Sequence, residues 1–499
     1  MMKKITIILL CVLLSSTISS VAITIDDDQS VQISGNNEWP MFRHDPQHLG
    51  YSDTNAPDTN NIIWTFESYE HFDWSSPVVA DEKLYIGSWF TQEEGSLGRV
   101  YCIDAMTGCY IWDQTINGSV YSTPAVVDGK LYVGSKDNNV YCLDAENGDF
   151  IWSYTTDDWV ISSPTVVNGK VYIGSYDKKA YCLNAENGSL IWEYMTDGFV
   201  KASIAVSNGK AYIGTWWGSM YCLNAENGSP IWTYETYYEI DSSPAVVDDR
   251  IYFGSMDRNL YCLDAIGNID GTTDLIWSFS TGDGIMDSSP AVAYGKVYIG
   301  SFDGRLYCVD ALNGSLIWSQ TIGELIYSSP SVADGKVYIG SYLNQRLYCL
   351  DAETGDYIWE YKTGMIFSSP AIVENKVFIA SAIPHVIYAF QDPAKFAIGE
   401  ITGGFNISAT FENVGISDAT NIKWNVFIRG GILNFIDRHI SGSVATLSKG
   451  DTIFIQTDKQ FLGFGRVNIT VLVEASDAAP VWKTVNGFAL FSQVIILSE

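Results

Sequence analysis

Basic residues are scarce in this chain of 499 residues. It carries 28 lysines and arginines against 58 aspartates and glutamates, and its formal net charge is -30. Nucleic acids and anionic membrane surfaces are bound largely through clusters of Lys and Arg, because neutralising their charge releases condensed counterions. The composition therefore predicts that no nucleic acid is a partner.

Long apolar runs are absent after the N-terminus. The first residues have Lys3 and Lys4, then an apolar run from Ile5 to Leu14, then small residues up to Ala22. This order predicts a secretory signal peptide over residues 1–22, because the run is shorter than the ~20 residues that a membrane anchor needs. We expect a secreted, extracytoplasmic protein at the cell surface, with no transmembrane segment in the mature chain.

Patterns that bind metals are also missing. None of the nine cysteines has another as its neighbour, and no Cys-x-x-Cys or His-Glu-x-x-His occurs. Zinc sites and zinc proteases need such clusters of ligands. The sequence predicts no metal site and no cofactor-binding residue.

A repeat of about 40 residues is the main feature that is present. A Ser-Ser-Pro element followed by an apolar run returns along the chain, with small variations. Its last residue is Pro77, Pro124, Pro164, Ile204, Pro244, Pro290, Pro330 or Pro370. A fixed period of this size indicates stacked or radial units of supersecondary structure.

Each repeat predicts four strands. In "SSPTVVNGKVYIGSYDKKAYCLNAENGSLIWEY", residues 162–194, alternating apolar runs are separated by Asn168-Gly169 and by Asn187-Gly188. Asn-Gly between alternating runs is typical of tight hairpins, and four strands in 40 residues make one propeller blade. The class is therefore all-β.

An Ile-Trp pair in the last strand of each repeat gives the number of blades. The tryptophans are Trp64, Trp112, Trp152, Trp192, Trp232, Trp277, Trp318 and Trp359. Trp64 precedes the first Ser-Ser-Pro, and the last repeat has no Ile-Trp of its own. We therefore expect an eight-bladed propeller of four-stranded blades over residues 61–392, closed by the N-terminal strand at 61–66, after a lead-in at 23–60.

These residues resemble the pyrroloquinoline-quinone (PQQ) repeat family. "CLDAENGDFIW" at 142–152 and "CLDAETGDYIW" at 349–359 are similar to its tryptophan-docking motif, Ala-x-Asp-x-x-Thr-Gly-x-x-x-Trp. The lead-in "WPMFRHDPQHLGYS" at 39–52 resembles the segment that precedes many such propellers. Cysteine takes the place of the motif's alanine at Cys102, Cys142, Cys182, Cys222, Cys262, Cys308 and Cys349. We expect these cysteines to be small, buried and unpaired.

The resemblance implies two alternative functions. Quinoprotein dehydrogenases of this fold hold PQQ over calcium in the central funnel, and many carry two adjacent cysteines, which this chain lacks. The propeller component of the outer-membrane barrel-assembly machine, BamB, is not an enzyme. We expect no catalytic residues and a BamB-like binding or scaffold module for protein or glycan partners, with a PQQ- and calcium-dependent dehydrogenase as the alternative.

The residue before each Ser-Ser-Pro element is predicted to face the channel. These residues are Trp74, Tyr121, Ile161, Lys201, Asp241, Asp287, Tyr327 and Phe367. The fourth repeat departs most from the others, with "KASIAV" and "GTWWGS". The candidate binding patch is therefore Lys201, Trp216, Trp217, Glu239, Asp241 and Asp287. Exposed tryptophans are suited to binding a sugar ring, a peptide or a planar ligand. Alternatively, the repeat has only drifted, and Lys201 pairs with Asp241 between blades.

The period ends before residue 396. "NIKWNVFI" alternates, which puts Ile422, Trp424, Val426 and Ile428 on one face of a strand. Several such runs over residues 396–499 predict an immunoglobulin-like β-sandwich. "FENVGISDATNI" at 411–422 resembles the start of adhesion-type (CARDB-like) domains of prokaryotic cell-surface proteins.

Overall fold

The computed structural model describes residues 38–92, 95–403, 406–415, 418–430, 436–457, 463–476, 478–491 and 493–496. The expected signal peptide and the first part of the lead-in lie outside these residues. Every regular element in the described ranges is a strand, which confirms the all-β class. None of these residues belongs to a helix of the length and apolarity that spanning a membrane requires.

The repeat region forms sheets of four antiparallel strands, which in all but the last sheet are consecutive along the chain. The first three are β3 (Val78–Ala80), β4 (Lys83–Gln92), β5 (Gly95–Asp104) and β6 (Tyr110–Ile116); β7 (Ala125–Val127), β8 (Lys130–Gly134), β9 (Asn139–Asp144) and β10 (Phe150–Thr155); and β11 (Thr165–Val167), β12 (Lys170–Gly174), β13 (Lys179–Asn184) and β14 (Leu190–Met195). The next three are β15 (Ala205–Ser207), β16 (Lys210–Gly214), β17 (Ser219–Asn224) and β18 (Pro230–Glu235); β19 (Ala245–Val247), β20 (Arg250–Gly254), β21 (Asn259–Asp264) and β22 (Leu275–Ser280); and β23 (Ala291–Ala293), β24 (Lys296–Gly300), β25 (Arg305–Asp310) and β26 (Leu316–Thr321). A further sheet has β27 (Ser331–Ala333), β28 (Lys336–Ser341), β29 (Arg346–Asp351) and β30 (Tyr357–Lys362), and β1 (Tyr51–Ser52) pairs with β27.

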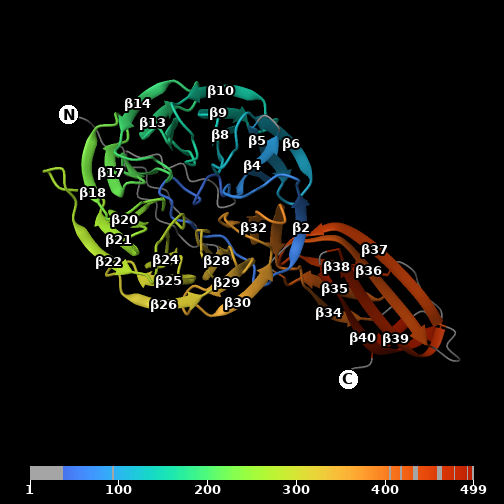
Figure 1. Ribbon diagram of the computed structural model, residues 1–499. Helices are drawn as coiled ribbons and strands as arrows, with labels where there is room; N and C mark the ends of the chain where they lie inside the picture. Colours follow the sequence, from blue (N-terminus) through green and yellow to red (C-terminus); the bar gives the residue numbers. More distant parts are fainter. Residues whose placement is uncertain are drawn as a thin grey trace, which may run out of the picture. The chain divides into compact units, whose positions relative to one another are not determined.

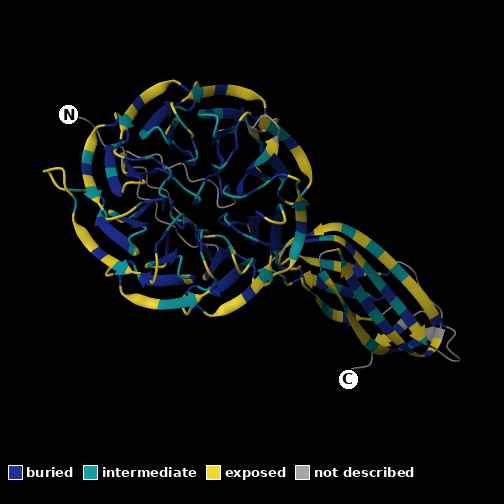
Figure 2. Cartoon of the chain, in the orientation of Figure 1, coloured by how far each residue is buried: buried dark blue, intermediate teal, exposed yellow. Residues whose placement is uncertain are grey.

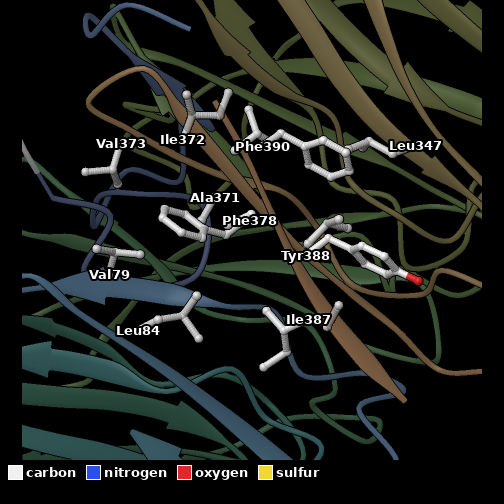
Figure 3. Packing of buried hydrophobic residues seen from close by; sticks show 14 of the residues in the cluster. Val79, Leu84, Leu347, Ala371, Ile372, Val373, Phe378, Ile387, Tyr388 and Phe390 are labelled. Atoms are coloured by element: carbon white, nitrogen blue, oxygen red, sulfur yellow. The ribbon is translucent and has the colours of Figure 1, made fainter. Parts of the chain in front are cut away.

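The last sheet takes one strand from the start of the chain. It contains β31 (Ala371–Val373), β32 (Lys376–Ser381) and β33 (Val386–Gln391), and its outer strand is β2 (Ile62–Glu67). Trp64 of β2 is paired with Ala389 of β33, as the offset of the Ile-Trp pairs predicted. Figure 3 shows Phe378 and Ile387 of this sheet in one apolar cluster with Val79 and Leu84 of the first sheet. Burial of that cluster joins the two ends of the repeat region.

The sheets are arranged as a ring (Figure 1). The innermost strand of each sheet contacts that of the next, and β31 contacts β3. The outermost strands alternate exposed and buried residues, whereas the strands inside them are almost wholly buried (Figure 2). This is the arrangement of a β-propeller.

Hydroxyl groups link the innermost strands around the channel. The second hydroxyl residue of each Ser-Ser-Pro element accepts a hydrogen bond from the backbone N–H of its counterpart in the preceding sheet, at 2.8–3.1 Å. Ser369 donates to Ser76, which closes the circle. The hydroxyl is kept in the variant copies at Thr123 and Ser203. These bonds satisfy backbone donors that no β-ladder reaches.

An indole and a phenol join most of the sheets to the next; in the last sheet Phe378 replaces the tyrosine, and the sheet before it donates to Pro57 of the lead-in. The Trp112 indole N–H and the Tyr85 hydroxyl both donate to the carbonyl oxygen of Ala145 in the following sheet, at 3.3 and 3.0 Å. A Cβ on Gly148, whose φ is +80°, would lie 2.7 Å from the Trp112 ring. Only glycine therefore suits this position, which both adopts a left-handed conformation and contacts the ring.

The cysteines lie between these two aromatic residues. Cys142 is the cross-strand partner of both Tyr132 and Trp152. The centres of these two rings are 5.9 Å apart. A small side chain is needed below two such rings. All cysteines in the described ranges are free, and every one except the exposed Cys109 is buried. Burial raises the pKa of the Cys142 thiol to about 12, so it is protonated at neutral pH.

The lead-in crosses the ring and binds the innermost strands. Backbone N–H groups of Val126, Val206, Val246, Val292 and Val332 donate to carbonyl oxygens of residues 40–50, at 2.7–2.9 Å. The buried Arg43 guanidinium donates to the carbonyl oxygens of Pro330 and Pro290, and the ring of buried His48 is 2.9 Å from the Thr165 hydroxyl. The lead-in therefore covers one end of the channel.

The C-terminal region forms two further antiparallel sheets. One contains β34 (Phe396–Thr402), β35 (Ser408–Asn413) and β38 (Thr452–Gln456). The other contains β37 (Ile436–Leu447), β36 (Ala419–Gly430), β39 (Gly463–Ala475), β40 (Ala478–Phe491) and β41 (Gln493–Ile496). Residues of both sheets share one apolar core. Ile422, Val426 and Ile428 are buried in it and Trp424 packs against it, so the predicted face of that strand is confirmed.

Replacing one of the joining tryptophans should destabilise the ring strongly. Trp192 is buried and donates to the Ala225 carbonyl oxygen at 2.9 Å. We expect Trp192→Ala to lower the free energy of unfolding by about 3–5 kcal/mol, because it leaves a cavity and removes one of the two hydrogen bonds to the Ala225 carbonyl, which Tyr172 alone then keeps. Denaturant unfolding measures this change. Tyr237→Ala, at a side chain exposed to 90%, is the control and should change it by less than about 0.5 kcal/mol.

His48 should make the protein less stable in acid. Burial lowers the pKa of His48 to about 4 from its usual 6.5. Between these two pH values the imidazole is protonated in the unfolded chain and neutral in the folded chain. The stability due to neutral His48 is complete above pH 6.5 and decreases by about 3 kcal/mol towards pH 4. Denaturant unfolding over this range should show a shallower acid decline for His48→Gln. Exposed His439→Gln is the control and should lose stability in acid as the unmodified protein does. An equally steep loss of stability in His48→Gln would contradict the prediction.

Candidate functional site

One cavity of about 240 Å³ lies in the channel. Its floor includes Phe42 of the lead-in, and its wall includes hydroxyl residues of the circle described above. All the residues that precede a Ser-Ser-Pro element line it, as the repeat predicted: Trp74, Tyr121, Ile161, Lys201, Asp241, Asp287, Tyr327 and Phe367. Because the lead-in covers one end, a ligand enters from the other.

A buried ion triad forms one side of this cavity. Lys201 Nζ is 3.1 Å from Asp241 Oδ2 and 2.6 Å from Asp287 Oδ1. The Asp241 side chain is 2% exposed and that of Asp287 is 13% exposed. Asp241 Oδ1 and Asp287 Oδ2 are buried and have no hydrogen-bond partner. The triad carries one net negative charge and two unused acceptors.

The environment shifts the pKa values of Asp241 and Lys201. Burial raises the pKa of the Asp241 carboxyl to about 6, against the opposing effect of the Lys201 ammonium. Burial alone would lower the pKa of Lys201, but the charges of Asp287 and Asp241 outweigh it and leave that pKa raised. Lys201 is therefore a permanent cation and has no free base to offer in a reaction.

A row of aromatic rings leads outward from the cavity. Tyr176, which lines the cavity, stacks on Phe199 at 5.1 Å, and Phe199 stacks on Trp216 at 5.3 Å. Trp159 lies at the cavity end of this row, 5.9 Å from Tyr176. We call these four residues the aromatic row. Trp159 and Trp216 are exposed at its ends.

The structure divides the patch predicted from the sequence. Lys201, Asp241 and Asp287 come together in the cavity, so the expected pairing of Lys201 with Asp241 is present, with Asp287 as a third member. Trp216 and Trp217 are exposed but do not line the cavity. Trp217 lies beside Lys178, whose Nζ is 5.0 Å from its ring, and Glu239 is half-buried.

Another charged residue, Lys136, lines the cavity wall and was not predicted from the sequence. Its Nζ lies 3.9 Å from the centre of the Trp159 ring and 4.8 Å from that of Tyr121. Burial lowers its pKa. The signal was available, because Lys136 directly follows the Gly-Ser that ends the second strand, at the position of Tyr176 and Trp216 in later repeats.

Comparison with protein families gives one match. The family described as outer membrane protein assembly factor BamB matches residues 54–196, 182–270 and 266–386, about two thirds of the chain. No curated protein matches the sequence.

Many solved structures share the fold. BamB from Moraxella catarrhalis is 16% identical with a TM-score of 0.55, and the match covers 66% of this chain and 99% of that one. A quinohemoprotein alcohol dehydrogenase from Comamonas testosteroni is 16% identical with a TM-score of 0.61, covering 72% and 81%. A europium-containing methanol dehydrogenase is 13% identical with a TM-score of 0.58, covering 76% and 90%. At these identities the likeness shows the fold alone.

No group of three or more His, Cys, Asp or Glu side chains in the described part of the chain could hold a metal. In the cavity, Lys201 Nζ occupies the position between the Asp241 and Asp287 carboxylates, so a calcium ion there would have to displace it.

Removing the cation of the triad should destabilise the fold in a pH-dependent way. We expect Lys201→Met to lower the free energy of unfolding by about 3–5 kcal/mol near neutral pH, because two buried carboxylates are left unpaired. Protonation relieves this, so the loss should be smaller near pH 5 than near pH 7, as measured by denaturant unfolding. Lys130→Met, which breaks a pair with exposed Glu186, is the control and should cost less than about 1 kcal/mol at either pH.

Proposed function

The chain belongs to the family described as outer membrane protein assembly factor BamB, and we propose that it is a non-enzymatic binding or scaffold protein of the cell surface. Its partners are proteins or glycans. The description of the matched family as an outer membrane protein assembly factor supports a role in binding other proteins.

The proposal includes a specific architecture. Residues 61–392 form an eight-bladed propeller with the tryptophan-docking contacts of PQQ repeats, and residues 396–499 form an immunoglobulin-like sandwich of the adhesion type. The signal peptide at 1–22 directs export. The closed circle of hydroxyl contacts and the shared core of the two C-terminal sheets support this architecture.

The observation that carries the proposal is the aromatic row beside a cavity open at one end. Trp159 and Trp216 are 42% and 43% exposed, and Trp217 is 64% exposed. Exposed tryptophans on a rigid rim are typical of interaction surfaces, because they bury a large area with little loss of conformational entropy. The rings between the ends cover each other's faces, so a partner meets ring edges there and free faces only at the ends.

The triad suits a binding role. Asp241 and Asp287 are each bound to Lys201, and both line the cavity, where their charge can orient a ligand.

The test combines ligand screening with crosslinking. We expect that PQQ with calcium leaves the thermal unfolding of the mature protein unchanged, whereas a ligand at a hundred times its Kd adds about 2.7 kcal/mol of stability. A photo-crosslinker in place of Trp216 should capture a protein partner in the host cell, or a surface oligosaccharide should raise the unfolding temperature.

A crosslinker in place of Tyr69 is the matched control, because Tyr69 is fully exposed and lies outside the cavity and the aromatic row. Equal capture from both positions would contradict a specific rim surface. Stabilisation by PQQ with calcium, accompanied by quinone absorbance, would replace the proposal with the dehydrogenase. Failure of both the crosslink and the oligosaccharides would also overturn the proposal.

A further inference from the structure

We propose that the channel cavity binds a small zwitterion of the amino-acid class. Its ammonium group binds the free carboxylate oxygens of Asp241 and Asp287, and its carboxylate binds Lys136. This inference rests on the proposed function, since it names the ligand of a cavity that performs no chemistry.

The carboxylate side of the cavity requires a donor. Asp241 and Asp287 both line the cavity, and Asp241 Oδ1 and Asp287 Oδ2 have no partner, although the other oxygen of each carboxylate contacts Lys201. These two oxygens are themselves buried, so a ligand ammonium reaches them once the carboxylates turn toward the cavity, where it gains a charge-assisted hydrogen bond. The triad has one negative charge in excess, so a cation balances it and a neutral hydroxyl does not.

Lys136 supplies the opposite charge. Its ammonium contacts the rings of Trp159 and Tyr121 and forms no ion pair with any described residue. Burial lowers its pKa, and no carboxylate counteracts that effect. The other lysine of the cavity wall, Lys201, is bound on both sides. An anionic ligand group would therefore be drawn to Lys136.

The two charged sides face each other across the channel. Lys136 belongs to the sheet of β7, and Asp287 directly precedes the sheet of β23. Three innermost strands separate β7 from β23 in either direction around the ring, so the two sheets lie on opposite sides. A ligand with a cation at one end and an anion at the other matches this polarity, whereas a ligand with one charge leaves one side unsatisfied.

The rest of the cavity suits a short apolar linker. Trp74, Ile161, Tyr327 and Phe367 line the wall, and Phe42 lies at the closed end. Its volume of about 240 Å³ is below the range of drug-sized pockets, which favours a molecule of amino-acid size. The ligand is either free or the end of a peptide.

The test uses ligands matched in length and different in charge. Isothermal titration calorimetry on the full mature chain would compare ε-aminocaproate with hexylamine and caproate, and with the shorter zwitterions glycine and γ-aminobutyrate. We expect one of the zwitterions to bind at least about tenfold more tightly than both hexylamine and caproate. Comparing the affinity for free lysine with that for lysine at the end of a short peptide shows whether the ligand is a free molecule or the end of a peptide.

Two substitutions separate the two ends of the ligand. Lys136→Met should remove the advantage of the zwitterion over hexylamine, and Asp287→Asn should remove its advantage over caproate. Lys130→Met lies in the same sheet as Lys136 but outside the cavity and should leave the affinities unchanged. Circular dichroism and the unfolding temperature show that each variant is folded, and Lys136→Gln replaces any Lys136→Met that is not.

The outcomes distinguish this inference from the proposed function. Equal affinity for hexylamine would overturn it in favour of a plain cation site, and equal affinity for caproate in favour of an anion site. Binding of glucose, or of none of these compounds, would also overturn it. In each of these cases crosslinking from position 216 still tests the proposed function, which fails only by its own criteria.

Discussion

The alanine carbonyl that receives both an indole N–H and a phenol hydroxyl is the contact on which this ring depends. Ala145 accepts from Trp112 and Tyr85, and the same arrangement recurs from sheet to sheet. Each sheet lies between two neighbours and buries both faces against them, so a single sheet is unstable alone. The paired hydrogen bonds tie one strand of each sheet to a fixed point of the next.

The constraint explains both the uniformity of the repeats and the position of their exceptions. Tyr132, Cys142 and Trp152 form a row across three strands, and a change in any of them disturbs the next sheet. Residues at the channel end of each repeat do not take part in these contacts between sheets. Lys136 differs from its counterparts Tyr176 and Trp216, and the contacts between sheets do not constrain that position. The residues that precede Ser-Ser-Pro vary in the same way, from aromatic to charged, and they line the cavity.

The same distinction decides how much the sequence could predict. The period, the four strands of each sheet, the strand donated at Trp64 and the channel lining all follow from patterns that recur. The path of the lead-in does not, because its carbonyl groups bind backbone N–H groups, which every residue but proline carries. Trp216 and Trp217 were grouped with Lys201 because they share a repeat. The ring separates them, because Trp216 lies on the aromatic row outside the cavity.

The lead-in also determines what kind of function the channel can have. A passage open at both ends could admit a substrate on one side and release a product on the other. Here backbone hydrogen bonds to strands around the ring hold the lead-in across one end, and Phe42 lies against the cavity. Two residues of the aromatic row, Trp159 and Tyr176, also line the cavity. The small ligand and the partner that we propose would therefore share these two side chains, and each would alter the surface that the other contacts.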